Sequence, residues 1–400
     1  MMLDTPKANR LHIAIFGRRN VGKSSLINAI TGQNIALVSK LAGTTTDPVY
    51  KAMELLPIGP VVIIDTAGLD DKGEIGELRI KKTKEVMDKT DLALLVFNSN
   101  ISDIDLEKEW YIELKNRNIP IVGVINRIDE KDINVNLLKK EFDLSFIKVS
   151  AKEQINIGKL KEAIQANAPM DFERETIVGD ILKPKAVVVL VAPQDLQAPK
   201  GRLILPQVQI IRDILDNDAM ALTVKDSELE DILKTLKKNP DLVITDSQIF
   251  HKVNNLIPSE VPLTSFSILM ARYKGDLDIF VKGAKAIDTL KPGDKVLIAE
   301  ACTHHALTGD IGRQKLPKWL ENKVGGKLDV TVNAGVDFPE DLKPYKLIFH
   351  CGSCMFNRKQ LMTRIIRAVQ QGVPITNYGI AIAHMNGILE RTINMFSGEK

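Results

Sequence analysis

The segment Gly17–Ser24, with the sequence GRRNVGKS, constrains the fold more than any other part of this 400-residue chain. It follows the apolar run Leu11–Phe16 and precedes a helical pattern over 25–30, which is the strand–loop–helix context of a P-loop. In such a loop, backbone N–H groups and the helix N-terminus point at phosphate oxygens. Lys23 adds a positive charge at the β- and γ-phosphates, and Ser24 places a hydroxyl on Mg²⁺. We therefore expect a nucleotide-binding α/β domain.

Two further motifs complete the phosphate and metal end of this site. Asp65–Gly68, with the sequence DTAG, ends the apolar run Val61–Ile64. Asp65 can reach Mg²⁺ through water there, and the Gly68 amide can sense the γ-phosphate. The loop Gly43–Asp47 lies between the P-loop and this motif and supplies hydroxyls for the metal.

Two motifs near the end of the same region indicate the base. Asn126–Asp129, with the sequence NRID, ends the run Ile121–Ile125. The Asp129 carboxylate can accept two N–H bonds from the guanine edge, whereas adenine offers no matching pair of donors. The segment Ser150–Lys152 follows another apolar run, and the Ala151 amide can meet the guanine oxygen. The pattern predicts GTP rather than ATP.

This set of motifs resembles the translation-factor-related GTPases, and within them the Era and TrmE-like group. The resemblance points to Thr45 as a Mg²⁺ ligand, with Thr44 and Thr46 as the alternative positions. Leu69 stands where Ras-like enzymes carry a water-positioning glutamine. Asn20 matches the position at which potassium-activated members hold K⁺, and its alternative role is to stabilise the loop.

The motifs and the resemblance together predict the site residues. Arg127 stands where the family usually has lysine, and its aliphatic stem can cover the base equally well. The residues expected to bind GTP are Gly17, Asn20, Val21, Gly22, Lys23, Ser24, Ser25, Asp65, Gly68, Asn126, Arg127, Asp129, Ser150, Ala151 and Lys152. The expected Mg²⁺ ligands are Ser24, Thr45 and Asp65, the expected K⁺ ligand is Asn20, and the expected catalytic residues are Lys23, Thr45 and Gly68.

The three cysteines of the chain, Cys302, Cys351 and Cys354, predict a second site. Each half of the set follows an apolar run, 296–299 or 347–349, and two strands of one sheet would bring both halves to its carboxyl edge. Three thiolates suit a structural zinc site with one histidine, or a 4Fe–4S cluster with one iron not held by cysteine. Unligated thiols and a thioredoxin-like pair are other interpretations. The long gap between the halves favours the iron–sulfur cluster.

The cysteine pattern behind a GTPase of this type resembles the FeFe-hydrogenase maturation GTPases, the HydF family. The pattern is Cys-x-His at 302–304, a long gap, and His-Cys-x-x-Cys at 350–354. Segments 195–206, 309–317 and 374–381 also resemble this family, so that the resemblance covers essentially the whole chain. The gap between the histidines is slightly shorter than is usual in the family.

The resemblance implies a 4Fe–4S cluster on Cys302, Cys351 and Cys354 with an exchangeable fourth iron position. The chain would accept a di-iron precursor bearing carbon monoxide and cyanide from two radical-SAM maturases and deliver it to the FeFe hydrogenase apoprotein. GTP hydrolysis, stimulated by K⁺, would control the exchange of partners. A homodimer through the middle domain is implied as well.

Two histidines are candidates for the fourth ligand of the cluster, or for donors to its sulfurs. Strand alternation makes it difficult for His350 and Cys351 to reach one cluster together, which favours His304. Glu300, His305 and Asp337 remain further candidates.

Alternating strand and helix patterns, together with the resemblance, predict three α/β domains. Residues 1–167 would form a P-loop GTPase domain with a mostly parallel sheet and helices on both faces. Residues 168–264 would form a dimerisation domain, and residues 265–400 would form the 4Fe–4S domain. The segment 167–183, with Pro169 inside it, is typical of a linker.

Composition narrows the remaining classes of function. With 54 basic and 51 acidic residues, a net charge of +3 argues against a nucleic-acid partner. No apolar run approaches the roughly 18 residues needed to cross a bilayer, and the first residues lack an apolar signal segment. We expect a cytoplasmic protein without a membrane partner. The alternatives are an RNA-associated GTPase with a structural zinc site and a redox sensor whose thiols control GTP hydrolysis.

Overall fold

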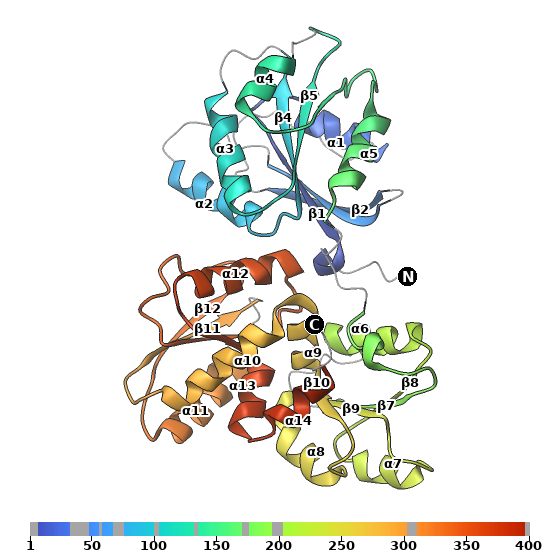
Figure 1. Ribbon diagram of the computed structural model, residues 1–400, viewed down its shortest axis with the longest axis vertical. Coiled ribbons are helices and arrows are strands. Elements are labelled where there is room, and N and C mark those ends of the chain that lie inside the picture. The colour runs from blue at the N-terminus through green and yellow to red at the C-terminus, as the bar shows by residue number, and fades with distance from the viewer. Residues whose placement is uncertain are drawn as a thin grey trace. The chain divides into compact units, whose positions relative to one another are not determined.

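Parallel β-strands organise every part of the chain that the structure describes. The computed structural model describes residues 7–32, 48–55, 58–66, 76–99, 104–131, 135–169, 176–193, 203–301 and 310–396. The chain divides into two units, Met1–Phe172 and Glu173–Lys400, both of which are α/β (Figure 1). The predicted fold class is confirmed. No helix within the described ranges is long and apolar enough to span a bilayer.

The first unit is built on a six-stranded sheet with the order β2-β3-β1-β4-β5-β6. Neighbouring strands are parallel except for the antiparallel pair β2 and β3. The strands are β1 (Leu11–Phe16), β2 (Val49–Leu55), β3 (Gly59–Asp65), β4 (Leu92–Asn98), β5 (Ile121–Asn126) and β6 (Phe146–Lys148). The predicted strands are confirmed, but β2 was missed because polar residues interrupt its sequence VYKAMEL.

Helices cover both faces of this sheet, as predicted. Two of them pack on the face that carries Ile13 and Ile15 of β1: α1 (Lys23–Thr31) and α5 (Ile157–Asn167). Three lie against the face that carries Ala14 and Phe16: α2 (Gly76–Met87), α3 (Asp105–Asn116) and α4 (Val135–Glu141). Because both faces are covered, β1 is buried at every position and is apolar throughout except at His12. Trp110 of α3 lies in this core.

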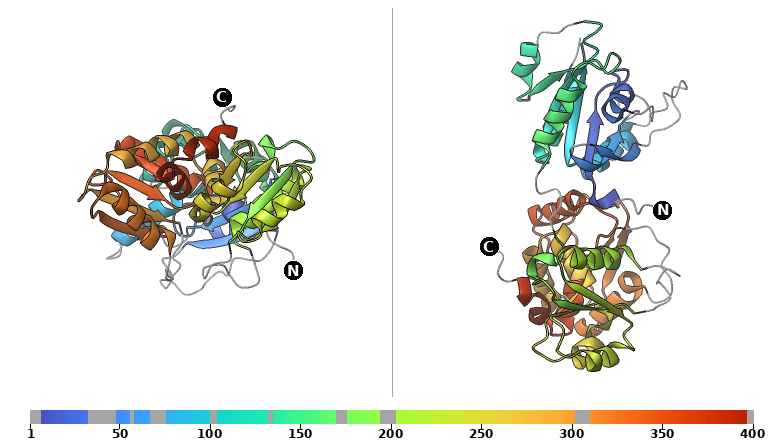
Figure 2. Two further views of the ribbon diagram at one scale, coloured as in Figure 1. Left: turned by 90° about the horizontal axis from the view of Figure 1, so that it is seen from below. Right: turned by 90° about the vertical axis from the view of Figure 1, so that its right-hand side faces the viewer.

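The second unit contains two four-stranded sheets, which lie side by side (Figure 2). The first sheet has the order β10-β9-β7-β8 and the second β12-β11-β13-β14, and all these neighbours are parallel. The first comprises β7 (Val187–Val191), β8 (Met220–Val224), β9 (Leu242–Thr245) and β10 (Leu263–Ser265). The second comprises β11 (Lys295–Glu300), β12 (Asp329–Ala334), β13 (Leu347–His350) and β14 (Ile375–Asn377).

One hydrophobic core joins the two sheets of the second unit. The helices around the first sheet are α6 (Leu205–Asp216), α7 (Leu229–Thr235), α8 (Phe250–Leu256) and α9 (Phe266–Lys274). Those around the second are α10 (Leu277–Lys285), α11 (Leu316–Val324), α12 (Arg358–Gln370) and α13 (Tyr378–Met385). Helix α14 (Leu389–Ile393) packs against β10 of the first sheet. Helix α9 contacts both α6 and α12, and it therefore connects the two halves of the unit.

Two segments differ from the sequence-based expectation. Residues 311–315, expected in a connection, form a helical turn that leads into α11, because the Asp310 side chain accepts from the Arg313 N–H. The end of the predicted linker is anchored rather than free. Asp213 Oδ2 accepts from the N–H groups of Val178 and Gly179 at 2.8 and 2.9 Å, and Val178 is buried.

His12 makes the stability of the first unit depend on pH. It is 8% exposed in β1, and its Nδ1 lies 2.8 Å from the carbonyl oxygen of Arg10. Burial lowers its pKa from 6.5 to about 4, and the charge of Lys89 acts in the same direction. The His12 ring therefore binds a proton more readily in the unfolded chain than in the folded chain. The stability from neutral His12 is present above its unfolded pKa and is lost as the pH falls toward 4.

We expect the protonation of His12 to lower the free energy of unfolding of the first unit by about 2 kcal/mol when the pH falls from 7 to 5. The chain has two tryptophans, Trp110 in the first unit and Trp319 in the second. In a Trp319→Phe background, urea unfolding followed by fluorescence reports on the first unit. Substituting His12→Gln should remove most of the loss, and an identical pH dependence with glutamine would contradict this assignment.

Candidate functional site

The motifs of the first unit meet at the carboxyl edge of its sheet. The P-loop connects β1 with α1, Asp65 is the last residue of β3, and Asn126 is the last residue of β5. Parallel strands bring these ends to one edge, where α/β sheets bind ligands. Ser24 and Ser25 lie in the first turn of α1, where N–H groups have no partner within the helix.

Two glycines allow the P-loop to lie directly against the strand ends. Gly22 has a φ of 88°, and a Cβ atom there would lie 2.4 Å from Nδ2 of Asn126. A Cβ atom at Gly17 would lie 2.6 Å from the carbonyl oxygen of Val96 on β4. Only glycine permits both approaches without displacing the neighbour.

The predicted phosphate and metal ligands lie close together. Lys23 is 5% exposed, and its ammonium group donates to the carbonyl oxygens of Gly17 and Arg18, the latter at 2.9 Å. Ser24 Oγ donates to Asp65 Oδ2 at 3.1 Å. A hydroxyl and a carboxylate at this spacing are oxygen ligands of the kind that Mg²⁺ prefers.

Several predicted residues lie outside the described part of the chain. They are Thr45 with its neighbours in the loop 43–47, together with Gly68 and Leu69. Their assignment to the metal, the γ-phosphate and the attacking water therefore stays a prediction.

Asn126 joins the P-loop to the predicted base-binding loop. Its side chain is buried, and Nδ2 donates to the carbonyl oxygen of Val21 at 2.9 Å. Its Oδ1 accepts from the N–H of Ala151 at 3.1 Å. Each such hydrogen bond contributes about 1 kcal/mol, and losing a buried partner costs more. In this geometry the amide orders two loops that are far apart in the sequence.

Asp129 lies where the predicted guanine motif meets the segment Ser150–Lys152. A hydrogen bond from the Ser150 side chain is the main influence that lowers the pKa of Asp129, and the charges of Lys152 and Arg127 act in the same direction. The carboxyl group is therefore ionised at neutral pH and accepts hydrogen bonds only. This is the protonation state that recognition of the guanine N–H groups requires.

Two non-glycine residues of the site adopt the left-handed backbone conformation. Asn20 and Arg127 both have a φ of 64°. Asparagine tolerates this region well, whereas for arginine it is uncommon and is maintained by the surrounding contacts. The carbonyl oxygen of Arg127 accepts from Ser99 Oγ at 2.9 Å, which fixes the turn after β5.

Glu107 is a residue of this site that the sequence analysis did not identify. It lies on α3 and is 3% exposed, and its two carboxylate oxygens each lie 3.0 Å from Nε of Arg18 in the P-loop. The sequence shows only an acidic residue near the start of a helix, and neither its burial nor its contact with the P-loop can be read from that.

The second predicted site lies at the carboxyl edge of the sheet that contains β11 and β13. Cys351 follows β13 directly, and Cys354 lies in the turn before α12. The backbone N–H of Ala301 donates to Sγ of Cys351 at 3.1 Å, and the N–H of Cys351 donates to the carbonyl oxygen of Ala299 at 3.0 Å. Cys302 and His304 lie outside the described residues, but Ala301 adjoins Cys302 and contacts the Cys351 thiol.

These contacts fit a thiolate-bound cluster. Backbone N–H groups that donate to cysteine sulfur stabilise negative charge on that sulfur. Cys351 and Cys354 are both partly buried, and no disulfide joins them. Burial raises the pKa of Cys354, and the positive charge of Lys274 opposes this effect. Among the described residues, no group of three or more His, Cys, Asp or Glu side chains can hold a metal ion. Cys302, the third cysteine of the predicted set, lies outside the described residues.

His350 is fully buried and has partners at both ring nitrogens. Arg364 Nη1 donates to Nε2 at 3.2 Å, and because a guanidinium group can only donate, Nε2 is the unprotonated nitrogen. Nδ1 lies 3.1 Å from both the carbonyl oxygen of Cys351 and Ser353 Oγ. Burial and the charge of Arg364 lower the pKa of His350 to about 3. The geometry is that of a residue that orders the cysteine turn.

Two other candidates for the fourth ligand are described. The carboxylate of Glu300 is paired with Arg313, whose Nη2 lies 2.8 Å from Oε2. Asp337 lies in an exposed position after β12. His305 lies outside the described residues, as His304 does, so the preference for His304 stays a prediction.

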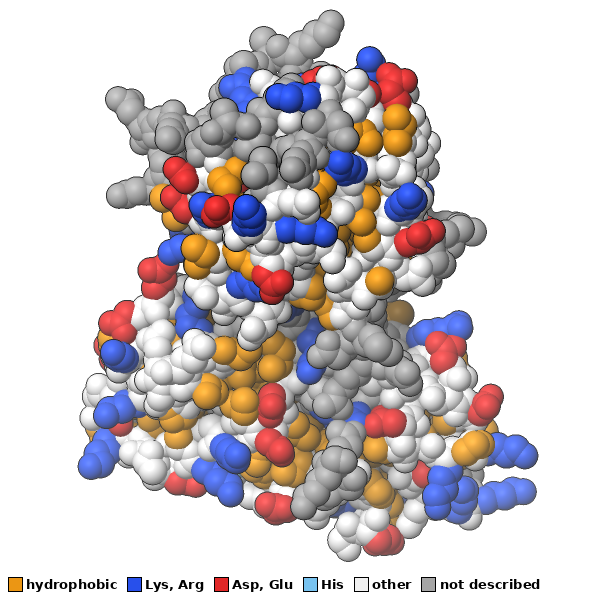
Figure 3. All heavy atoms as spheres, turned by 45° about the horizontal axis from the view of Figure 1, so that its top comes forward, with side chains coloured by type: hydrophobic (Ala, Val, Ile, Leu, Met, Phe, Trp, Pro, Cys, Tyr) orange, Lys and Arg blue, Asp and Glu red, His pale blue; other side chains and the backbone are white. Residues whose placement is uncertain are grey.

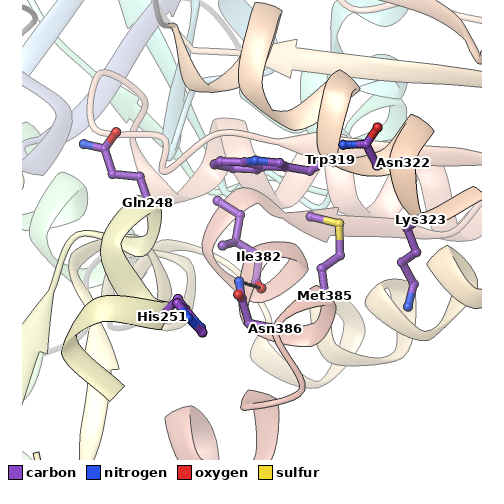
Figure 4. Close-up of a pocket in the computed structure, with 8 residues that line it drawn as sticks. All are labelled: Gln248, His251, Trp319, Asn322, Lys323, Ile382, Met385 and Asn386. Atoms are coloured by element: carbon purple, nitrogen blue, oxygen red, sulfur yellow. Dashed lines mark hydrogen bonds between the residues drawn. The ribbon is translucent and has the colours of Figure 1, made fainter. Parts of the chain in front are cut away.

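A pocket of about 400 Å³ lies between the two halves of the second unit (Figure 4). Trp319, Ile382 and Met385 form its apolar wall, and Gln248 and His251 face them from the other half. Its described lining contains none of the residues predicted to bind nucleotide or cluster.

Comparisons with known proteins agree with this arrangement. A family model described as a 50S ribosome-binding GTPase matches residues 12–127. The model of the Hydrogen maturase F dimerization domain matches residues 177–275, and that of the Hydrogen maturase F tetramerization domain matches residues 278–395. The fold, the P-loop and these matches define a P-loop GTPase with two additional α/β domains.

The order of the three domains then identifies the family. The chain belongs to the HydF family of hydrogen maturase GTPases. The predicted family is thereby confirmed.

Curated relatives match the GTPase part. The tRNA modification GTPase MnmE of Endomicrobium trichonymphae is 36% identical over 159 residues, which is 38% of this chain and 34% of that protein. The GTPase Der of Sulfurimonas denitrificans is 31% identical over 173 residues, 40% of this chain and 35% of the relative. The chain thus spans about a third of the length of these relatives.

Solved structures of related GTPases are also similar to the chain. Era in complex with MgGDPNP and 16S ribosomal RNA has a TM-score of 0.36 at 20% identity, covering 56% of this chain and 95% of Era. A probable GTP-binding protein, engB, has a TM-score of 0.31 at 26% identity, covering 39% of this chain and 97% of engB.

The contact between Gly22 and Asn126 predicts the effect of an added methyl group. Gly22→Ala should displace the Asn126 amide and weaken GDP binding at least tenfold, as measured by calorimetry. Gly32→Ala is the matched control, because Gly32 is also left-handed at 67° but has nothing within 4 Å of a Cβ atom. Both variants carry backbone strain of about 1 kcal/mol. Equal GDP affinities in the two variants would contradict the role given to this contact.

Proposed function

We propose that the chain is a GTPase that carries a cluster precursor during maturation of the FeFe hydrogenase. One observation carries the cluster part of this proposal, the hydrogen bond from the Ala301 N–H to Sγ of Cys351. It brings the residue before Cys302 to the turn that contains Cys351 and Cys354. Cys351 and Cys354 at this sheet edge, with Cys302 next to Ala301 in the sequence, are the three thiolate ligands that a 4Fe–4S cluster needs.

In this proposal the three cysteines hold the cluster and leave one iron without a cysteine ligand. That iron, when the cluster is bound, supplies an exchangeable position for a di-iron precursor bearing carbon monoxide and cyanide. His304 or another replaceable group occupies the position between transfers. His350, hydrogen-bonded on both sides, keeps the turn in place. The precursor comes from two radical-SAM maturases and goes to the hydrogenase apoprotein.

The GTPase domain regulates these exchanges. Lys23 and the N–H groups of the P-loop hold the phosphates, and Ser24, Thr45 and Asp65 hold Mg²⁺. Asp129 selects guanine, and the Gly68 amide senses the γ-phosphate. With Leu69 in place of a water-positioning glutamine, a K⁺ ion at Asn20 supplies positive charge beside the phosphates. Hydrolysis changes which partner the chain binds, and the chemistry of the cluster remains in the C-terminal domain.

The chain acts as a homodimer through its middle domain. Strand β8 is an edge of the first four-stranded sheet of the second unit, so its backbone groups can pair with another chain. Three apolar side chains of this region are exposed, Val208 by 42%, Leu215 by 54% and Met220 by 48%. These residues lie in the range matched by the dimerization model. The tetramerization model over the C-terminal range supports oligomers in general.

The surface supports protein partners rather than nucleic acid. On the face shown in Figure 3, positive and negative side chains are interspersed, in keeping with the net charge of +3. A nucleic-acid interface would gather Lys and Arg on one surface. The proposed cluster needs its cysteines as thiolates, which fits a reducing compartment, and we place the protein in the cytoplasm.

Anaerobic reconstitution with iron and sulfide tests the cluster. We expect the reduced wild-type chain to show the EPR signal of a 4Fe–4S cluster, and Cys302→Ser and Cys351→Ser to lose it. His251→Ala, on the separate pocket, is the control and should retain the signal. A colourless wild-type chain with one zinc ion would instead support an RNA-associated GTPase with a structural zinc site.

Potassium dependence tests the role of Asn20. GTP hydrolysis should be faster in K⁺ than in Na⁺ at equal ionic strength, and Asn20→Ala should abolish the difference. Asn118 has a similar left-handed backbone, with a φ of 50°, but lies after α3 and outside the site. Asn118→Ala should therefore keep the K⁺ effect. Equal wild-type rates in the two salts would rule out the K⁺ site.

A further inference from the structure

Lys274 is a fully buried lysine that no motif of the GTPase or of the cysteine pattern includes. It is the last residue of α9 and is 2% exposed. Its Nζ donates to the carbonyl oxygens of Ser353, Cys354 and Phe356, at 3.2, 3.3 and 2.8 Å. The three hydrogens of the ammonium group are thus matched by three carbonyl oxygens of one turn. This turn carries Cys354.

The other end of α9 supports the same turn. Ser267 Oγ donates to Asn377 Oδ1 at 2.9 Å, and Nδ2 of Asn377 donates to the carbonyl oxygen of Cys351 at 3.3 Å. Ser267 and Lys274 are seven residues apart and therefore lie on one face of the helix. The cysteine turn is held along this face at two points, and Lys274 makes the only charged contact of the two.

Lys274 and the cysteines lie in the ranges of two different family models, whose boundary falls after the one expected at residue 264. Lys274 lies in the range matched by the dimerization model, 177–275, whereas the cysteines lie in the range of the tetramerization model, 278–395. The α9 helix packs against both α6 of the first half and α12 of the second. The conformation of the cysteine turn therefore depends on how the middle domain is packed.

A buried ammonium group is stable only where its contacts compensate for the hydration that it loses. Moving it out of water is unfavourable, whereas its hydrogen bonds to carbonyl oxygens are charge-assisted and strong. The position at the C-terminus of α9 adds the attraction of the helix dipole. The same charge lies next to a turn whose thiolates and cluster would be negative, and reduction of the cluster adds further negative charge. A neutral side chain in this place would lack the charge on which the strength of these interactions depends.

We propose that Lys274 is a positioning residue for the cluster, holding the Cys351–Cys354 turn in the ligating conformation and placing a positive charge beneath it. This role rests on the proposed function, because it presumes a cluster on these cysteines. Lys274 holds the carbonyl oxygens of the turn in place before the cluster binds, and it favours the reduced cluster once it is bound. The middle domain thereby sets both the shape and the redox balance of the site.

The first arm of the test needs no cluster. Hydrogen exchange is measured on the full-length chain without iron, for the backbone amides of 351–357. We expect Lys274→Met to exchange at least tenfold faster there than wild type, with unchanged exchange in the first unit. Lys282→Met is the matched control, because Lys282 is an exposed lysine on the next helix, α10. If the amides of 351–357 exchange in Lys274→Met at the same rate as in wild type, the positioning role is overturned.

The second arm measures the reduction potential of the reconstituted cluster by an EPR-monitored titration. At a fixed potential, Lys274→Met should lower the ratio of reduced to oxidised cluster at least tenfold, which is a shift of 59 mV for one electron. Lys274→Arg keeps the charge and should stay near the wild-type value. If Lys274→Met does not fold, Lys274→Gln replaces it, since an amide keeps a donor but removes the charge.

The two arms separate this proposal from the proposed function. A wild-type chain that binds no cluster would overturn the proposed function, and with it the redox role of Lys274. A wild-type chain that binds the cluster, with an unchanged potential in both uncharged variants, would overturn the redox role alone. A lowered reduction potential in Lys274→Met, together with a near wild-type potential in Lys274→Arg, would support the role of the positive charge.

Discussion

The parallel register of β11 and β13 determines the second site. Ala299 pairs with His350, so that both strands end at the same level of the sheet. The residues that directly follow the two strands, Ala301 and Cys351, are then in contact, and the Ala301 N–H donates to the Cys351 thiol. Two cysteine-bearing segments about fifty positions apart are brought together in this way. A shift of the register by one residue would turn every side chain of the strand to the other face and separate them.

Both candidate sites depend on the same geometrical rule, because each occupies the carboxyl edge of a parallel sheet. In each, a buried polar side chain holds a loop that lies far from it in the sequence. Asn126 joins the P-loop to Ala151, and Lys274 joins three carbonyl oxygens of the cysteine turn. Such groups cost free energy to bury and are therefore retained only where their hydrogen bonds are complete. The consequence is that both loops are ordered by the protein itself.

Much of this arrangement could be predicted from the sequence, because it resides in local patterns. Leu11–Phe16 is apolar except at His12, so the strand before the P-loop was recognisable, and the order of the motifs indicated a GTPase. The short strands β10 and β14 and the half-polar strands β8 and β12 gave no such signal. The partners of Asn126 and Lys274 depend on packing between elements about 80 to 105 positions apart, which no local pattern reports. Glu107 was missed for the same reason.

The central claim is that one chain combines a GTP-controlled domain with a carrier site for a hydrogenase precursor. The most direct measurement loads the reconstituted chain with a synthetic di-iron complex bearing carbon monoxide and cyanide, mixes it with hydrogenase apoprotein, and follows hydrogen evolution. The account predicts that the wild-type chain activates the hydrogenase and that a chain with Cys354→Ser does not. Equal activation by both chains, or by the free complex at the same concentration, would contradict a carrier role for the cysteine site.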